Sequence, residues 1–220
     1  MPSMSDPVYQ VRQCLRPACR FRFPVKLNEE ENTRCPKCGS PSLAVELPYT
    51  AMRVKSLDDD TGTPVEVLLD NIRSTFNVGA MFRTADGAGI RHMHLCGITP
   101  TPDHPKIGKT ALGAERALPW TQCWDGQAAA ADLVKAGCRL WALEGGEGAE
   151  MLFDVSNDLP GAPIVLVVGN EVCGVDPGIL AHCERRLYIP MQGVKESLNV
   201  AIAFGIAVYF LRYGLHQRIQ

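Results

Sequence analysis

From residue 65 onward, short runs rich in β-branched and apolar residues alternate with segments of helical character. The expected strands are 65–69, 91–98, 139–143, 164–168 and 186–190, and the expected helices are 78–87, 106–118, 127–136, 177–183 and 198–213. Strands that alternate with helices form a parallel α/β sheet. Such sheets bind ligands beyond the carboxyl ends of their strands, so we expect the functional residues in the loops that follow the strands.

Four of the nine cysteines form two short-spaced pairs near the start of the chain, Cys14 with Cys19 and Cys35 with Cys38. Two such pairs can place four thiolates on one tetrahedral zinc ion, in an arrangement that resembles a zinc ribbon. Fewer than about 50 residues can hardly bury a stable core, so the metal would supply the folding free energy. Four unrelated cysteines or a redox pair are the alternatives. The sequence thus predicts a zinc-ribbon-like domain over residues 1–48.

The composition indicates the broad class of the chain. The 220 residues are 46% hydrophobic and 21% charged, which is typical of a globular chain, and the net charge of −2 gives no overall positive field for nucleic acid. Residues 1–48 are nevertheless locally basic, with seven cations against five acids. The Gly, Pro and acid content of residues 49–64 predicts a linker, followed by a second domain over 65–220.

No segment predicts a membrane partner. The longest apolar run, residues 200–211, is shorter than the roughly 20 residues of a bilayer span and is typical of a core or subunit-interface helix. The first residues lack the apolar core of a secretory signal. We therefore expect a cytoplasmic protein, and in a reducing compartment the nine cysteines, an odd number, do not suggest a disulfide framework.

Three segments that follow predicted strands carry polar side chains. Asn77 is expected to cap a helix whose small-residue face bears Arg83 and suits close approach by a ligand or a second subunit. Glu171 lies in a glycine-rich turn just past the strand 164–168. Ser197 and Asn199 precede the last helix, and one of them is the expected cap. Taken singly, each segment also fits an ordinary turn or helix start.

Together the three segments are specific enough to indicate a protein family. Asn77-Val78-Gly79-Ala80-x-x-Arg83-Thr84, Gly169-Asn170-Glu171 and Ile189-Pro190-Met191-x-Gly193-x-x-x-Ser197-Leu198-Asn199-Val200 resemble, in order, the signature motifs of the SpoU-type (TrmH-like) RNA methyltransferases of the SPOUT class. The resemblance covers residues 65 to 220. It departs from the family at Val172, where a glycine is often found, and at the following Cys173.

The resemblance implies a parallel-sheet domain with a C-terminal trefoil knot that works as a homodimer. It implies S-adenosylmethionine as the methyl donor, held by Leu143, Glu144, Gly145, Gly169, Asn170, Glu171, Ile189, Met191, Ser197 and Leu198. The implied reaction methylates a ribose 2′-hydroxyl of structured RNA, either tRNA or rRNA. Arg83 matches the residue that acts on the hydroxyl, as a primed base or as an electrostatic stabiliser. Asn77, Glu171, Ser197 and Asn199 match residues that orient Arg83, the cofactor or the substrate.

RNA contacts are expected from five cations, namely Arg16, Arg20, Arg22, Lys37 and Arg73. For Arg20 and Arg22, which alternate with Phe21 and Phe23, a solvated strand face is the alternative. Two other functions stay open at this stage. One is a non-catalytic RNA-binding protein on a methyltransferase fold, and the other is an enzyme that methylates a base. The presence of Arg83, Glu171, Ser197 and Asn199 together favours the ribose methyltransferase.

Overall fold

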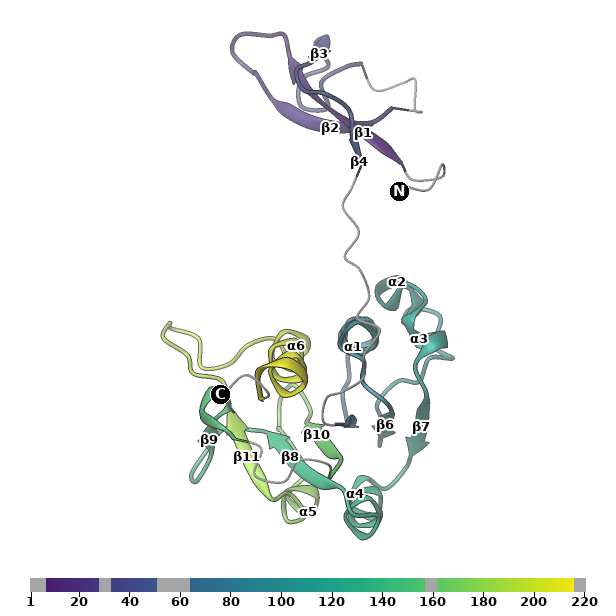
Figure 1. The fold of residues 1–220 in the computed structure, drawn as a ribbon, viewed down its shortest axis with the longest axis vertical. Coiled ribbons are helices and arrows are strands. Elements are labelled where there is room, and N and C mark those ends of the chain that lie inside the picture. Colours follow the sequence, from purple (N-terminus) through teal and green to yellow (C-terminus); the bar gives the residue numbers. More distant parts are fainter. Residues whose placement is uncertain (1–6, 28–32, 51–63, 157–161, 216–220) are drawn as a thin grey trace. The chain divides into compact units, whose positions relative to one another are not determined.

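The computed structural model describes residues 7–27, 33–50, 64–156 and 162–215. They fall into two compact units, one within residues 1–58 and the other within residues 59–220 (Figure 1). Most of the segment predicted as a linker, residues 51–63, lies outside the described residues.

The first unit is a small antiparallel sheet around strand β1 (Val8–Cys14). Strand β1 pairs with β2 (Arg22–Lys26), β3 (Ser42–Ala44) and β4 (Tyr49–Thr50), so pairing reaches two residues past the predicted boundary at 48. Its buried apolar core consists of Cys14, Phe23, Val25 and Cys35 among the described residues. A core this small contributes little hydrophobic free energy, and two of its four members are candidate metal ligands.

The second unit contains a seven-stranded sheet whose pairings are all parallel, as the alternating pattern predicts. Its strand order is β7-β6-β5-β10-β8-β11-β9. The strands are β5 (Val65–Asp70), β6 (Met93–Cys96), β7 (Trp120–Cys123), β8 (Arg139–Leu143), β9 (Glu150–Met151), β10 (Ile164–Val168) and β11 (Arg185–Tyr188). All five residues of the central strand β10 are buried. Such a continuous apolar run is typical of a parallel strand covered on both faces.

Helices cover both faces of this sheet (Figure 1). Helices α1 (Thr75–Ala88) and α6 (Val200–Tyr209), the latter continued by a π-turn over Phe210–Gly214, pack on one face around Phe82, Trp141 and Phe204. Helices α4 (Gly126–Lys135) and α5 (Pro177–Leu180) cover the other face. The remaining short helices are α2 (Gly108–Ala111), α3 (Ala114–Ala117) and a 3-10 turn at Leu152–Asp154. The result is the three-layer α/β architecture predicted from the sequence, while the trefoil knot stays a prediction.

Several boundaries differ from the prediction for local reasons. The helix expected over 106–118 is two short helices, because Leu112 (φ 53°) and Gly113 (φ 102°) adopt left-handed backbone that ends the first. Ser74, not Asn77, caps α1, since its side chain accepts from the Asn77 N–H at 3.3 Å. Strands β7 and β9 were not predicted. Asn199 caps α6, as expected for one of the two candidates.

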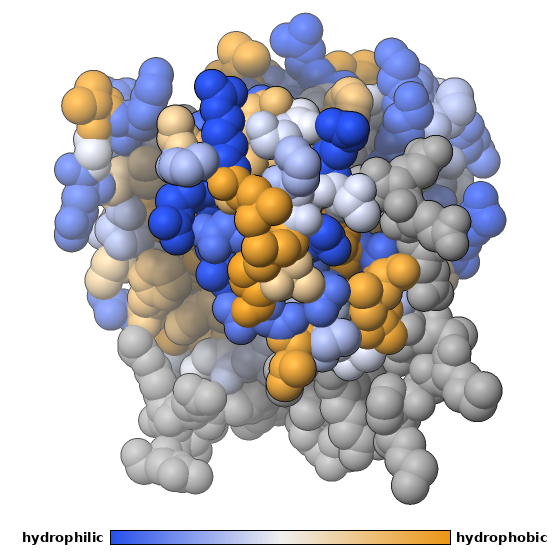
Figure 2. Space-filling model, turned by 90° about the horizontal axis from the view of Figure 1, so that it is seen from above, coloured by the Kyte–Doolittle hydropathy of each residue, from blue (hydrophilic) through white to orange (hydrophobic). Residues whose placement is uncertain are grey.

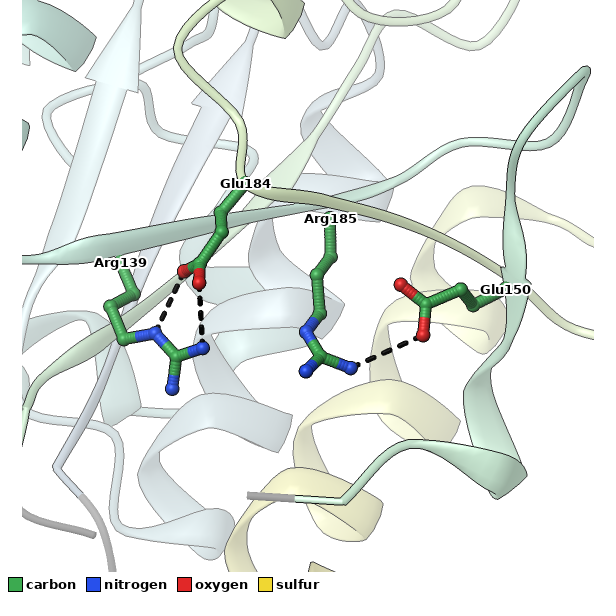
Figure 3. Close-up of polar contacts among 4 residues, drawn as sticks. All are labelled: Arg139, Glu150, Glu184 and Arg185. Carbon is green, nitrogen blue, oxygen red and sulfur yellow. Dashed lines mark hydrogen bonds and ion pairs between the residues drawn. The ribbon is translucent and has the colours of Figure 1, made fainter. Parts of the chain in front are cut away.

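Two arginines, the first residues of β8 and β11, form ion pairs with acids on or beside neighbouring strands (Figure 3). Arg139 donates to both carboxylate oxygens of Glu184, at 2.7 and 2.8 Å, and Arg185 donates to Glu150 at 3.2 Å. Both guanidinium groups also lie over the buried Trp141 ring, 5.3 and 5.2 Å from its centroid. The Arg139–Glu184 ion pair and the contacts of both guanidinium groups with Trp141 therefore stabilise the same neighbours, β8 and β11.

Among the described residues, no helix is long and apolar enough to cross a membrane.

Candidate functional site

A pocket of about 430 Å³ opens at the carboxyl ends of β8, β10 and β11. Its walls come from the three loops that follow these strands and from the start of α6. The lining residues are Leu143, Glu144, Gly145, Val168, Gly169, Asn170, Glu171, Val172, Gly174, Leu187, Tyr188, Ile189, Met191, Glu196, Ser197, Leu198, Asn199, Val200 and Ala203. All ten residues predicted to bind the cofactor are in this wall. The pocket therefore lies where parallel α/β sheets place their ligands.

The turn after β10 is built on a close backbone approach. A methyl group on Gly169 would overlap the backbone of Gly174 and Val175, so only glycine fits there. Asn170 and Gly174 exchange both backbone hydrogen bonds at 3.0 Å, and Gly174 has a φ of 76°. The Glu144 carboxylate accepts from the Val175 N–H at 3.1 Å, which joins the loop after β8 to this turn.

Glu171 binds the start of α1 through its carboxylate. It accepts from the Arg73 N–H at 2.9 Å, from the Ser74 N–H at 3.1 Å and from the Asn77 side chain at 3.0 Å. Burial raises the pKa of Glu171, but these N–H donors together with its own backbone N–H outweigh it and hold the pKa below the usual value. Glu171 is thus an anionic acceptor that orders the α1 entry beside the pocket.

The Asn77 side chain joins all three motif segments. Its Nδ2 donates to Glu171, and its Oδ1 accepts from Nδ2 of Asn199 at 3.2 Å. Asn199 at the same time caps α6, accepting from Ala201 N at 2.9 Å. Asn77 was expected to act as a cap, but Ser74 takes that place and leaves the amide free to link the two loops.

Asp70 and Asn71 support this site and were missed by the sequence analysis. Asn71 has a φ of 54°, and its carbonyl accepts from the Asn170 side chain at 2.7 Å. The Asp70 carboxylate, 2% exposed, accepts from Asn71 Nδ2 at 2.7 Å and from Asp176 N at 2.9 Å. Burial raises the Asp70 pKa. An Asp-Asn pair at the end of a buried strand is a signal that could have indicated such a junction.

Arg83 lies apart from the other predicted catalytic residues. It is exposed on α1, does not line the pocket, and pairs with no acid among the described residues. The small-residue face that carries it was expected to suit a ligand or a second subunit. At Gly79 that expectation is wrong, because an added methyl group would overlap Thr110 and lie 2.6 Å from the Ile107 carbonyl. This part of the face packs against α2 instead.

The four paired cysteines meet in the first unit. Their Sγ atoms all lie within 4.8 Å of one another, with Cys14 and Cys38 at 3.5 Å and Cys19 and Cys35 at 3.9 Å. Zn–S bonds of about 2.3 Å in a tetrahedron put the sulfurs about 3.8 Å apart, so the donor set fits zinc. The Ser40 hydroxyl and N–H lower the pKa of Cys38 to about 6, whereas burial raises that of Cys14 to about 12. A central cation would stabilise all four as thiolates.

The cations predicted to contact RNA differ in their surroundings. Arg16, Arg20 and Lys37 are exposed around the cysteine loops, and Arg73 is exposed beside Glu171. Arg22 is instead paired with Glu46 at 2.6 Å. On the face shown in Figure 2, hydrophobic residues lie in small groups among hydrophilic ones. In the first unit, Leu15, Phe21 and Leu43 are 40% or more exposed.

Comparison with known proteins gives consistent matches. The model of the SpoU rRNA Methylase family matches residues 64–209. The chain is 33% identical over 148 residues to the Bacillus subtilis 23S rRNA (guanosine(2553)-2'-O)-methyltransferase RlmP, covering 66% of this chain and 57% of that protein. It is 31% identical over 164 residues to the Pseudomonas syringae pv. tomato 23S rRNA (guanosine-2'-O-)-methyltransferase RlmB, covering 72% and 62%.

Among solved structures, the AdoMet-bound rRNA methyltransferase from Sinorhizobium meliloti superposes with a TM-score of 0.62 at 28% identity, covering 76% of this chain and 64% of that one. The matches thus span about three fifths of the two curated relatives' length.

Proposed function

The chain belongs to the SpoU rRNA methylase family, and from this membership we propose that it transfers a methyl group from S-adenosylmethionine to a ribose 2′-hydroxyl of RNA. The observation that carries the proposal is the pocket after β8, β10 and β11, which gathers all ten predicted cofactor residues. The two curated relatives act on 23S rRNA, so ribosomal RNA is the first substrate class to test.

The pocket residues suit a nucleoside with a charged amino-acid tail. Leu143, Leu187 and Ile189 provide apolar wall for a flat base, while Glu144 and the backbone of the glycine turn offer acceptors and donors. Bound there, S-adenosylmethionine supplies an electrophilic methyl group on a sulfonium. Glu171, Asn77 and Asn199 hold the three loops in one geometry, so the groups that would bind the cofactor and the ribose keep fixed positions.

Arg83 is the residue that we expect to act on the ribose 2′-hydroxyl. In the reaction the methyl carbon exchanges its bond to sulfur for one to the 2′-oxygen, and the hydroxyl proton must leave. The guanidinium, with a pKa above about 12, would stabilise the developing alkoxide through its N–H donors. In the alternative route, a neighbouring phosphate would first accept a proton from the guanidinium, and the neutral guanidine would then accept the hydroxyl proton. Ser197 lines the pocket and is assigned to cofactor and substrate orientation.

A second copy of the chain would complete the site. Arg83 does not line the pocket of its own chain. Helices α1 and α6 pack together, and with the π-turn that continues α6 they expose Phe76 (56%), Ile202 (57%), Tyr209 (46%) and Tyr213 (38%). An apolar face of this kind suits a homodimer, which would bring Arg83 to the partner's pocket.

In a reducing compartment that holds RNA, such as the cytoplasm, the cysteines would not form disulfides, and four of them would hold a structural zinc.

The test is incubation of the purified protein with total cellular RNA and methyl-labelled S-adenosylmethionine, followed by digestion to nucleosides. The expected result is label in a 2′-O-methylnucleoside that is lost in Arg83→Ala and kept in Arg186→Ala, an exposed arginine outside the site. Calorimetry should show that Arg83→Ala still binds S-adenosylmethionine. Label in a base would contradict transfer to the ribose hydroxyl. A wild-type protein that does not bind S-adenosylmethionine would contradict the whole proposal.

The homodimer has its own test. Arg83→Ala and a pocket variant such as Gly169→Ala are mixed, unfolded, refolded together and assayed. If Arg83 acts across the interface, the mixture regains methyl transfer that neither variant shows alone. A wild type that sediments as a monomer while turning over would contradict this arrangement.

A further inference from the structure

Two large apolar side chains are exposed at the carboxyl ends of the neighbouring strands β6 and β7. Ile98 is 65% exposed and Trp124 is 79% exposed. The strands pair Cys96 with Cys123, and the Gly97 N–H donates to the Cys123 carbonyl at 2.9 Å, so the residues that follow emerge side by side. Neither side chain belongs to the pocket, and an exposed tryptophan contributes little to folding.

This pair lies on the same edge of the sheet as the pocket and is connected to it by hydrogen bonds. The Ile98 N–H donates to Oδ1 of Asn71 at 3.2 Å, and the Asn71 carbonyl accepts from Asn170 at 2.7 Å. The strand order from β10 through β5 and β6 to β7 makes three steps of about 4.8 Å, or roughly 14 Å in all. The exposed pair is therefore within a few nucleotides of the Glu171 turn.

Three exposed cations near this pair can contact the phosphates of a nucleic acid. Arg73 lies between the pocket and Ile98 in the sheet order, and Lys106 and Lys109 follow Ile98 in the loop to α2 and in α2 itself. All three are exposed, and within the described ranges none pairs with an acid. The acid next to Trp124, Asp125, is occupied in capping α4, where it accepts from Ala128 N at 2.9 Å.

We propose that Trp124 and Ile98 form a stacking platform for an unpaired base of the substrate RNA, close to the nucleotide that is methylated, with Arg73, Lys106 and Lys109 along the phosphates. Unpaired bases stack on exposed aromatic rings, and each stacked base contributes about 1–3 kcal/mol to binding, in addition to the cation–phosphate contacts. The proposal rests on the proposed function for its choice of RNA. Two side chains cover far less than the roughly 800 Å² per partner of a stable protein interface, which argues against a second protein.

The first test measures binding without turnover. The probe is a fluorescein-labelled single-stranded oligouridylate, and its anisotropy is titrated with wild type, Trp124→Ala, Trp124→Phe and Val134→Ala. Val134 is the matched control, since it is 43% exposed at the far end of α4. We expect Trp124→Ala to bind about tenfold more weakly. Trp124→Phe should restore most of the affinity, and Val134→Ala should equal wild type.

The second test uses the methyl-transfer assay with total cellular RNA. Trp124→Ala should raise the RNA concentration needed for half-maximal rate while kcat and S-adenosylmethionine affinity stay unchanged. Equal oligouridylate affinity in Trp124→Ala and wild type would overturn the platform. A Trp124→Ala variant that lowers kcat without raising the RNA concentration needed for half-maximal rate would also overturn it. A change in the sedimentation of Trp124→Ala would instead show that Trp124 lies in a protein interface. Because the anisotropy needs no turnover, a chain that binds the probe through Trp124 yet never methylates would contradict only the proposed function.

Discussion

Nδ2 of Asn199 donates to Oδ1 of Asn77 across 3.2 Å of space and 122 residues of sequence. This bond joins the cap of α6 to the first turn of α1, two helices that cover one face of the same sheet. The other end of the Asn77 amide donates to Glu171. The site therefore depends on an uncharged side chain that donates and accepts at once, a requirement that asparagine meets and aspartate does not.

Asn77→Asp should reduce methyl transfer by about 10- to 100-fold. The change keeps the shape but removes the donor to Glu171 and places a second carboxylate about 3 Å from it, a loss of about 1.5–3 kcal/mol for a hydrogen bond to a charged group. Single-turnover kinetics with saturating S-adenosylmethionine measures the effect. Gln122→Glu adds the same charge at an exposed strand position and should leave the rate unchanged. A fully active Asn77→Asp would contradict the bridging role.

The contribution of Glu171 to stability should depend on pH. Its pKa is below the usual value in the folded protein, so the stabilisation is complete above the unfolded pKa of about 4.3 and is lost as pH falls through the lower folded value. Glu171→Gln carries no charge to lose. Urea unfolding should therefore show wild type more stable than the variant at pH 7, with the difference shrinking below about pH 4. A difference that is constant from pH 7 to pH 3.5 would be inconsistent with this assignment.

The parts of the fold that the sequence predicts are those with strong local patterns. Strand β10 is a run of five apolar residues, and Asn199 precedes a uniformly apolar helix, so both were found. The helix break at Leu112 was missed because no sequence propensity predicts a leucine with left-handed backbone. Strand β7 was missed because its four residues do not alternate clearly between buried and exposed positions. The Asn77 bridge depends on loops about a hundred residues apart, which only the packed sheet brings together.

Gly169→Ala should destabilise the second unit by about 1–3 kcal/mol and weaken S-adenosylmethionine binding. The added methyl group overlaps the backbone of Gly174 and Val175, which cannot move aside as a flexible side chain could. Gly193→Ala is the matched control, because no atom lies within 4 Å of a methyl group there. Thermal unfolding and cofactor calorimetry report the two effects. Equal stability of the two variants would show that the turn relaxes at no cost.

Cys35→Ser should remove the metal and unfold the first unit while the second stays folded. The four sulfurs supply the donor set, and the apolar core beside them is too small to hold the sheet alone. Elemental analysis is expected to give about one zinc per chain in wild type and almost none in the variant. Cys138→Ser, outside the cluster, should keep its metal. A folded first unit without zinc in Cys35→Ser would show that the cysteines are not a structural metal site.

Arg139→Ala should destabilise the second unit by about 1–3 kcal/mol, whereas Lys135→Ala should cost less than about 0.5 kcal/mol. Both remove one ion pair, but the Arg139 side chain is 10% exposed, pairs with two oxygens and lies over Trp141, while Lys135 is 76% exposed in a single contact. Arg139 also lowers the pKa of Glu184, so this stabilisation is present above about pH 4.3 and is lost as pH falls further. Urea titrations at pH 7 and pH 3.5 measure both effects. Equal costs for the two variants at pH 7 would mean that burial and the Trp141 contact add nothing to the pair.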